Sequence, residues 1–188
     1  MNKLKDFFKK VIIISMNTEN LKKKIREIPD WPQKGINFKD ITPLLEDAES
    51  LKFTIDKLAD FFKDKKVEKV VGIDARGFLL ASAVAYRLGA GIAIVRKKGK
   101  LPSETIVQEY ELEYGSNTIE MHKDAIKPKE KTIIIDDVLA TGGTAQATAN
   151  LVESLGGDIV GLGFLIDLTF LKGKEKLAKY SIHSLIEY

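Results

Sequence analysis

One stretch of the sequence, Lys131-Thr-Ile-Ile-Ile-Asp-Asp-Val-Leu-Ala-Thr-Gly-Gly-Thr144, decides the predicted fold. It opens as an apolar, β-branched run, breaks at the acidic pair Asp136-Asp137, and continues through a loop that contains two glycines. Residues 145–155 follow, with apolar side chains at helical spacing. We therefore predict a buried strand, a binding loop and a helix, in that order.

Glycine and threonine give the predicted loop the chemistry of a phosphate site. Gly142 and Gly143 can adopt backbone angles closed to other residues and can turn successive N–H groups toward an anion. The following helix adds the positive end of its dipole. Thr141 and Thr144 add hydroxyl donors, and Thr144 is also placed to cap the helix. We expect this loop to bind phosphate.

The two aspartates before the loop call for a different ligand group. Carboxylates repel phosphate, so Asp136 and Asp137 require hydroxyl donors or a cation. A sugar phosphate supplies hydroxyls to the acids and phosphate to the loop. An ordinary strand–turn–helix joint with solvated acids is the alternative, and it would be preferred for Asp-Asp or Gly-Gly alone. The stretch fits neither the Walker pattern nor the dinucleotide-binding pattern.

Taken whole, the stretch closely resembles the signature of the phosphoribosyltransferases, which bind 5-phosphoribosyl-1-pyrophosphate (PRPP). In that family the two acids hold the ribose 2′- and 3′-hydroxyls, and the loop holds the 5′-phosphate. The resemblance therefore assigns Asp136 and Asp137 to the ribose of PRPP. The substrate-binding residues that it implies in and before the loop are Val138, Ala140, Thr141, Gly142, Gly143 and Thr144.

Composition limits the other classes of protein. A chain of 188 residues with 44% hydrophobic content is the size of one domain with a full core. The absence of cysteine excludes disulfides and thiolate metal sites, and two histidines are too few to suggest a zinc site. A net charge of +3, spread over many acids and bases, does not indicate nucleic-acid binding but suits an anionic substrate.

The beginning of the chain looks only superficially like an export signal. Its apolar run at 11–14 is shorter than the ~7–15 residues of a secretory core, and no Ala-x-Ala site follows. No run approaches the ~20 apolar residues that span a bilayer, so we expect a soluble, cytoplasmic protein. Met16 is a second plausible start. We predict that residues 1–15 are a dispensable extension and that residues 16–188 form a single domain.

A segment rich in proline and aromatic residues follows a predicted helix at 19–28. Pro29 should end that helix, and residues 30–45 are irregular. Pro29-Asp-Trp-Pro32 and Gly35-Ile-Asn-Phe-Lys-Asp40 resemble the amino-terminal hood of adenine phosphoribosyltransferases, which would occupy about 29–46 here.

The hood forms the base pocket in that family. The match implies that Phe38 stacks on adenine, whereas position alone would favour core packing for this side chain. It also implies that Ile36, Asn37 and Lys39 read the edge of the base. The family usually has arginine at Lys39 and often an apolar residue at Asn37, and lysine cannot reproduce a planar bidentate contact.

Two basic segments are candidates for binding the leaving group. Asp74-Ala-Arg-Gly-Phe78 joins a predicted strand at 69–74 to a helix that Gly89 ends. Arg76 should lie at the sheet's carboxyl edge and could grip a phosphate, although a helix-capping surface arginine fits its position equally well. This turn resembles the family's pyrophosphate-binding turn, which assigns Arg76 to pyrophosphate.

The second basic segment, Arg96-Lys-Lys-Gly-Lys-Leu-Pro102, follows a short predicted strand at 91–95. Such a run is simply solvated in most proteins, but an anionic leaving group needs compensating charge. The family carries Arg-Lys-x-Gly-Lys-Leu-Pro here, with contacts that can reach the neighbouring subunit's site. The resemblance implies substrate contacts by Arg96, Lys97 and Lys100, and it implies a homodimer.

Residues 105–122 alternate in polarity and turn at 115–117, which predicts a hairpin. A charged hairpin between core strands is a candidate flexible lid. Leu112-Glu-Tyr-Gly115 matches a segment that closes over the active site of adenine phosphoribosyltransferases. The match implies proton transfer by Glu113 with Tyr114 as its neighbour in the lid. Without it, Glu113 would be an exposed strand acid.

The repeated strand–helix order predicts an α/β fold with a mainly parallel central sheet and helices on both faces. The resemblance covers residues 19–188 and implies the type I phosphoribosyltransferase fold. It implies that adenine and PRPP give AMP and pyrophosphate, a purine salvage reaction, with Mg²⁺ held mainly by PRPP oxygens. Two alternatives remain open: a phosphoribosyltransferase for another base, and a non-catalytic, PRPP-sensing regulator of transcription.

Overall fold

The computed structural model describes residues 16–111 and 116–188. The chain divides into two compact units, residues 1–51 and 52–188, and the predicted hood lies within the first. The described elements of the first unit are α2 (Thr18–Lys22), β1 (Arg26–Ile28), β2 (Phe38–Asp40) and α3 (Thr42–Glu46), and α4 (Ala48–Asp60) runs on into the second unit.

The predicted helix at 19–28 is wrong beyond its first turns. Asn17 caps α2 by accepting a hydrogen bond from the amide of Asn20 at 2.8 Å, but the helix ends at Lys22. Residues 26–28 instead form β1, which pairs antiparallel with β2 so that Ile28 lies opposite Phe38. The helical spacing of apolar residues here is also compatible with a helix turn followed by a strand, and the pairing with β2 decides between them.

The second unit alternates strands and helices. Its described elements, after α4, are η1 (Lys63–Lys65), β3 (Lys69–Ile73), α5 (Arg76–Leu88), β4 (Gly91–Lys97), β5 (Thr105–Glu111), β6 (Ser116–His122), β7 (Lys131–Leu139), α6 (Gly143–Ser154), β8 (Asp158–Asp167), η2 (Thr169–Leu171), α7 (Gly173–Lys176) and β9 (Ile182–Glu187). Gly89 ends α5 with a positive φ of 68°, as its position after an apolar helix predicts.

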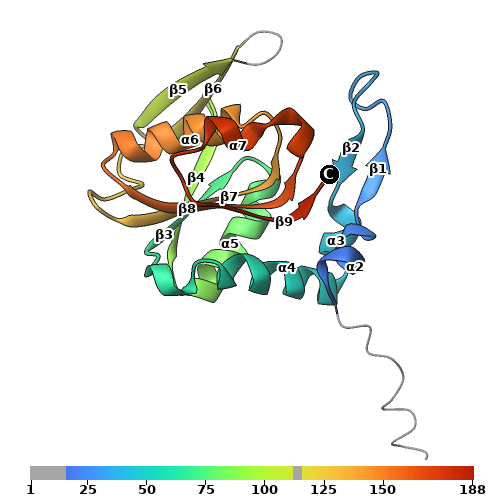
Figure 1. Cartoon of the computed structure of the whole chain (residues 1–188). Coiled ribbons are helices and arrows are strands. Elements are labelled where there is room, and N and C mark those ends of the chain that lie inside the picture. The colour runs from blue at the N-terminus through green and yellow to red at the C-terminus, as the bar shows by residue number, and fades with distance from the viewer. Residues whose placement is uncertain (1–15, 112–115) are drawn as a thin grey trace, which may run out of the picture. The chain divides into compact units, whose positions relative to one another are not determined.

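Within the described residues, the second unit holds a seven-stranded sheet in the order β5-β6-β4-β3-β7-β8-β9. The strands from β4 to β9 in this order run parallel, whereas β6 pairs antiparallel with both β4 and β5. Figure 1 shows α5 on one face of the sheet and α6 with α7 on the other. The prediction of a mainly parallel sheet with helices on both faces is confirmed.

Several strands are longer than their apolar runs. β7 does not break at the acidic pair but continues to Leu139, because its ladder with β8 includes Asp136 opposite Phe164 and Leu139 opposite Asp167. β4 likewise continues through Lys97 because it pairs with β6. Strand ends in this fold are therefore set by partner strands rather than by hydrophobicity.

The hairpin and the last helix also differ from the prediction. Ser116 lies opposite Glu111 and Asn117 opposite Tyr110, so these residues belong to β6 rather than to the turn. The connection is residues 112–115, which lie outside the described part of the chain. The sequence also predicts a short helix over residues 172–180, and the structure has only the single turn of α7 there.

The core of the second unit joins β3, β7 and β8 to α6. Val71, Ile134, Phe164 and Val152, one from each of these elements, are fully buried in one hydrophobic cluster. Burial of side chains of this size stabilises the fold by about 1.5–3 kcal/mol each. The cluster fixes the strands whose carboxyl ends carry the candidate site.

Candidate active site

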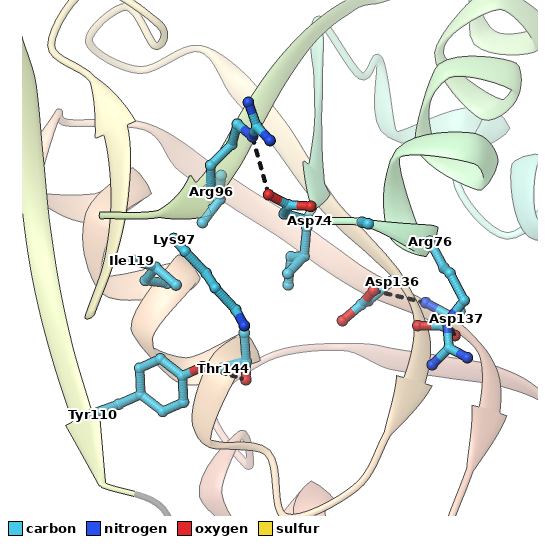
Figure 2. A pocket seen from close by; sticks show the side chains of 12 residues that line it. Asp74, Arg76, Arg96, Lys97, Tyr110, Ile119, Asp136, Asp137 and Thr144 are labelled. Atoms are coloured by element: carbon cyan, nitrogen blue, oxygen red, sulfur yellow. Dashed lines mark hydrogen bonds and ion pairs between the residues drawn. The ribbon is translucent and has the colours of Figure 1, made fainter. Parts of the chain in front are cut away.

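A cavity of about 230 Å³ lies at the carboxyl edge of the sheet, where the neighbouring strands β4, β3 and β7 end. Figure 2 shows side chains from these strands, from the start of α5 and α6, and from β5 gathered around it. Its polar lining comprises Asp74, Arg76, Arg96, Lys97, Tyr110, Asp136, Asp137 and Thr144. Residues predicted from three separated motifs thus meet at one place. Open α/β sheets commonly bind ligands at this edge, outside the carboxyl ends of their strands.

A second cavity, of about 70 Å³, lies within the phosphate loop. Asp136 and Thr144 line both cavities, so the two cavities are adjacent. The lining includes every residue that the resemblance assigns to the loop: Val138, Ala140, Thr141, Gly142, Gly143 and Thr144.

The acid pair lies between these cavities in a desolvated setting. Asp136 is only partly accessible to solvent, and desolvation by the surrounding protein, followed by the charge of Asp137, raises its pKa well above the ordinary value. The Asp137 carboxylate is 6% exposed and forms an ion pair with Nε of Arg76 at 2.7 Å. Burial raises the pKa of Asp137 as well, although the Arg76 guanidinium opposes this shift. The ionised form of the pair is therefore costly in this place, and hydroxyl donors from a ligand would stabilise it.

Close packing of α5 against β7 gives the pair its position. A Cβ atom on Gly77 would lie 2.6 Å from Oδ1 of Asp136 and 3.1 Å from the carbonyl oxygen of Ile135. A side chain at Gly77 would therefore displace Asp136 or the strand. The sequence analysis did not single out this residue, although it directly follows Arg76 in the basic turn.

The phosphate loop leads directly into α6. Gly142 occupies the N-cap position with a φ of 78°, a conformation that favours glycine, and α6 begins at Gly143. The prediction that Thr144 caps the helix is wrong, because Thr144 lies in its first turn. Its hydroxyl instead donates to the Tyr110 hydroxyl at 3.2 Å.

Tyr110 is a residue that the sequence analysis missed. It comes from β5 of the hairpin and lines the larger cavity beside Thr144 of the phosphate loop, as Figure 2 shows. Both Ile106 and Tyr110 pack against the core cluster, and strand alternation places them on one face. That alternation was the available signal. Glu113 and Tyr114, the predicted proton-transfer residue and its neighbour, lie outside the described residues.

Arg96 and Lys97 reach the cavity from the end of β4. Nε of Arg96 forms an ion pair with Oδ2 of Asp74 at 3.0 Å, and its Nη1 donates to the carbonyl oxygen of Lys100 at 3.2 Å. Lys97 lines the cavity, whereas Lys100 is exposed and does not line it. The structure thus places two of the three predicted cations at the cavity.

A buried glutamate shapes the turn that follows β4. Oε1 of Glu120 accepts hydrogen bonds from the amides of Lys100 and Leu101 at 2.7 and 2.8 Å. Burial, the largest influence, favours the neutral acid, but the backbone N–H groups of Leu101, Gly99 and Lys100 outweigh it and lower the pKa of Glu120. The basic turn is therefore closed around a carboxylate that the sequence analysis did not identify.

The predicted base-binding residues lie on and just before β2 in the first unit. Nζ of Lys39 pairs with Oε2 of Glu27 at 3.0 Å, and Nδ2 of Asn37 donates to the same oxygen at 2.7 Å. These contacts, that of Asn37 first, lower the pKa of Glu27. The ring of Phe38 meets Trp31 edge to face, with centroids 4.4 Å apart. Ile36 is exposed.

Comparison with known families identifies the class. A family model described as "Phosphoribosyl transferase domain" matches residues 42–184, most of the chain. The chain therefore belongs to the phosphoribosyltransferase family, with the type I fold that its sheet and flanking helices display.

Within that family, the chain is similar to proteins named adenine phosphoribosyltransferase. The enzyme of that name from Clostridium tetani is 57% identical over 169 residues, which cover 90% of this chain and 98% of the relative. The corresponding enzyme from Clostridium novyi is 56% identical over the same shares of the two chains.

Solved structures agree. Adenine phosphoribosyltransferase from Thermoanaerobacter pseudethanolicus has a TM-score of 0.90 and 52% identity, over 92% of this chain and 100% of that one. The Saccharomyces cerevisiae enzyme, complexed with D-2,5-dideoxy-2,5-imino-altritol 1,6-bisphosphate and adenine, has a TM-score of 0.84 and 38% identity, over 89% of this chain and 97% of that one. The predicted resemblance is confirmed.

Proposed function

We propose that this chain is an adenine phosphoribosyltransferase, which transfers the phosphoribosyl group of PRPP to adenine and releases pyrophosphate. The observation that carries the proposal is the meeting of the acid pair, the phosphate loop and the basic side chains at one sheet edge. Relatives of this name and the hood motif support adenine as the base.

The chemical step exchanges one bond for another. Adenine N9 forms a bond to the anomeric carbon of the ribose as the bond from that carbon to pyrophosphate breaks, and positive charge develops on the ribose ring. The bond electrons leave with pyrophosphate, and the proton on the attacking adenine passes to a protein carboxylate, which acts as the general base. Glu113 is the proposed acceptor of this proton, with Tyr114 beside it.

The sheet edge positions the sugar. The backbone N–H groups of residues 140–143 and the Thr141 and Thr144 hydroxyls bind the 5′-phosphate at the start of α6. Asp136 and Asp137 accept hydrogen bonds from the ribose 2′- and 3′-hydroxyls. A carboxylate in this desolvated place also stabilises positive charge on the adjacent ring more strongly than it would in water. Fixing the sugar in this way converts binding energy into correct orientation for attack.

Basic side chains bind the leaving group. Asp137 and Asp74 hold the guanidinium groups of Arg76 and Arg96 at the cavity. Together with Lys97 and Lys100 from the basic turn, they offset the charge that develops on pyrophosphate.

Mg²⁺ fits the oxygen donors gathered here. Mg²⁺ prefers oxygen ligands and commonly retains substrate phosphates among them, so PRPP oxygens would hold it. Among the protein groups at the site, the Asp136 carboxylate is the one whose chemistry is most similar to these ligands. The ion supplies charge neutralisation to the departing pyrophosphate. In residues 16–111 and 116–188, no three His, Cys, Asp or Glu side chains group so as to hold a metal.

Adenine recognition is assigned to the hood, where Phe38 stacks on the base and Ile36, Asn37 and Lys39 read its edge. We also propose a homodimer in the cytoplasm, in keeping with the family resemblance. Among the helices that the structure describes, none has the length and apolar character needed to cross a bilayer.

Turnover of PRPP with each of adenine, guanine, hypoxanthine, xanthine, uracil and orotate, with and without Mg²⁺, tests the proposal. We expect a strong, Mg²⁺-dependent preference for adenine. Preference for another base would overturn the assignment of the hood while retaining the PRPP site. PRPP binding without turnover of any base would replace the enzyme with a PRPP-sensing regulator.

A further inference from the structure

The phosphate loop rests against the backbone of a residue far along the chain, Gly173 at the start of α7. A Cβ atom on Gly173 would lie 2.2 Å from the carbonyl oxygen of Ala140 and 3.1 Å from the amide nitrogen of Gly142. In return, a Cβ atom on Gly142 would lie 2.6 Å from the carbonyl oxygen of Gly173. Two backbone segments thus touch at a distance that leaves no space for a side chain on either.

The contacted residues, Ala140 and Gly142, belong to the loop whose N–H groups bind phosphate in the proposed function. The N–H groups of residues 140–143 can face a phosphate only if the other side of the loop is filled and its carbonyl groups stay in place. Because the atoms in contact are backbone rather than flexible side-chain ends, any shift of Gly173 moves the loop itself. The conformation of the phosphate loop therefore depends on the position of Gly173.

An ion cluster fixes the turn that contains Gly173. Nζ of Lys174 contacts Oδ2 of Asp167 at 2.7 Å and Oε1 of Glu187 at 3.0 Å. Asp167 is 1% exposed and ends β8, where it lies opposite Leu139 of β7 on one side and Glu187 of β9 on the other. The lysine thus anchors the turn to the carboxyl ends of the same strands that position the loop.

The buried carboxylate makes this anchor hard to replace. A carboxylate as buried as Asp167 is costly without a cation, and Lys174 is the cation bound to it. The hydrogen bond to Asp167 and, after it, the contact with Glu187 raise the pKa of Lys174 above its ordinary value, although burial opposes this shift, so the lysine stays charged.

We propose that Gly173 and Lys174 are positioning residues for 5′-phosphate binding: the backbone of Gly173 supports the phosphate loop, and the Asp167–Lys174–Glu187 cluster holds that support in place. The inference rests on the proposed function, because it assumes that the loop binds the 5′-phosphate of PRPP. The proposal adds a structural requirement outside the PRPP motif. It also predicts that changes at these residues weaken 5′-phosphate binding without weakening the binding of pyrophosphate or adenine.

The variant Gly173→Ala tests the support. We expect its affinity for ribose 5-phosphate, measured by calorimetry, and its KM for PRPP each to worsen by at least about 10-fold, since a misplacement of ~1 Å can cost ~100-fold. Its affinity for pyrophosphate and its KM for adenine should stay within about twofold of the wild type. A general loss of structure would not produce this selectivity.

Gly157→Ala is the matched control. Its added Cβ would also be crowded, 2.7 Å from Cγ1 of Val152 and 2.8 Å from Cγ2 of Ile126, but these atoms do not line the site. We expect lower thermal stability with unchanged affinity for ribose 5-phosphate. Equal loss of that affinity in both alanine variants, or wild-type affinity in a folded Gly173→Ala protein, would overturn the proposal.

Lys174→Met tests the anchor while retaining the aliphatic stem. We expect weaker ribose 5-phosphate binding by about 5-fold, and no change for Lys176→Met, an exposed lysine on the same short helix. If Lys174→Met does not fold, adding Asp167→Asn removes the uncompensated charge, and the double variant should fold and still bind weakly. Wild-type affinity in that double variant would contradict the anchor.

Wild-type protein serves as the reference for both ideas. If it converts adenine and PRPP to AMP but Gly173→Ala binds ribose 5-phosphate normally, the positioning role alone is wrong. If the wild type neither turns over a base nor binds ribose 5-phosphate, the proposed function is wrong.

Discussion

The phosphate-binding edge of the second unit and the β1–β2 hairpin of the first are held in shape by different forces. At the sheet edge, backbone segments touch at Gly142 and Gly173, and Asp137 is nearly inaccessible to solvent. In the hairpin, contacts between side chains hold the predicted base-binding residues, and Glu27 and Trp31 are each 50% exposed. The first geometry is a product of packing, whereas the second depends on a few polar contacts. Changes at the sheet edge should therefore alter binding strongly, and changes in the hairpin should alter base selection with little effect on folding.

The largest expected effect comes from Asp137→Asn. The change removes the negative charge that pairs with Arg76 and that would face the ribose, so PRPP loses a charge-assisted partner in the transition state. We expect kcat/KM for PRPP to fall by about 100-fold or more, equivalent to ~2.7 kcal/mol. Steady-state kinetics at saturating adenine measure this change.

Stability distinguishes a binding role from a structural one for Asp137. Because asparagine also relieves the cost of burying a charge, we expect the free energy of unfolding to change by only ~1 kcal/mol. Asp158→Asn, at the exposed amino end of β8, is the matched control and should leave kinetics unchanged. If the free energy of unfolding falls by as much as the free energy that corresponds to the loss of kcat/KM, the role of the acid pair is structural. The sheet edge would then not differ from the β1–β2 hairpin in the way described above.

Asp136 should limit the stability of the sheet edge at neutral pH. Its pKa in the folded protein is raised above the ordinary value of 3.8, so its contribution is fully present below that pH. The contribution is lost as pH rises from that value through the folded pKa, because the unfolded chain releases this proton first while the folded protein still holds it. We expect Asp136→Asn to raise Tm by roughly 2–4 °C at pH 7.5 while lowering activity.

Calorimetric melting from pH 4 to pH 8 measures this effect. The gain in Tm of Asp136→Asn over the wild type should shrink as pH falls toward 4, where both proteins carry an uncharged side chain. A gain that does not depend on pH would mean that packing rather than ionisation distinguishes the two proteins.

The fold could be predicted where local sequence and long-range pairing agree. The β-branched run before Asp136 does form β7, and Gly89 does end α5. The prediction failed at residues 23–28, since apolar spacing there fits a helix while pairing with β2 imposes a strand. The extension of β7 to Leu139 was missed for the same reason, because β8 supplies its partner.

The site could be predicted where function resides in contiguous motifs. The acid pair, the loop and the basic segments can each be recognised from their residue types. The parallel strands then bring them to the carboxyl edge of the sheet. Three residues could not be predicted from the sequence, because each acts through a contact with a distant segment: Gly77, Gly173 and Glu120. The residues that neighbour a glycine or a glutamate in the sequence do not indicate which distant segment it will contact.

In the β1–β2 hairpin, Lys39→Ala should have a moderate effect on adenine binding and little effect on PRPP binding. Lys39 is 8% exposed and pairs with Glu27, so it is held rigidly, and we propose that it reads the edge of adenine. We expect KM for adenine to rise by about 10-fold, the equivalent of ~1.4 kcal/mol, and KM for PRPP to stay within about twofold. Lys34→Ala, an exposed lysine of the same loop, is the control. Equal increases in both KM values would remove Lys39 from base selection.

The smallest effect is expected from Asn37→Ala. Asn37 donates to Glu27, and this contact orients the carboxylate that holds Lys39. Loss of one exposed hydrogen bond should raise KM for adenine by only about threefold, since such bonds contribute ~0.5–1.5 kcal/mol. Gln33→Ala, whose side chain is exposed nearby, should change nothing.

A double-mutant cycle decides how Asn37 acts. If it works through Glu27 and Lys39, Asn37→Ala should add no further loss in the Lys39→Ala background. Additive losses would instead mean that Asn37 contacts the base directly, as the hood resemblance implies. Either result bears on the contrast between the two regions. Non-additive losses would mean that the polar residues of the β1–β2 hairpin act together, as the packed backbone segments of the phosphate edge do. Additive losses would mean that each residue of the hairpin contributes independently and can be substituted without affecting the others.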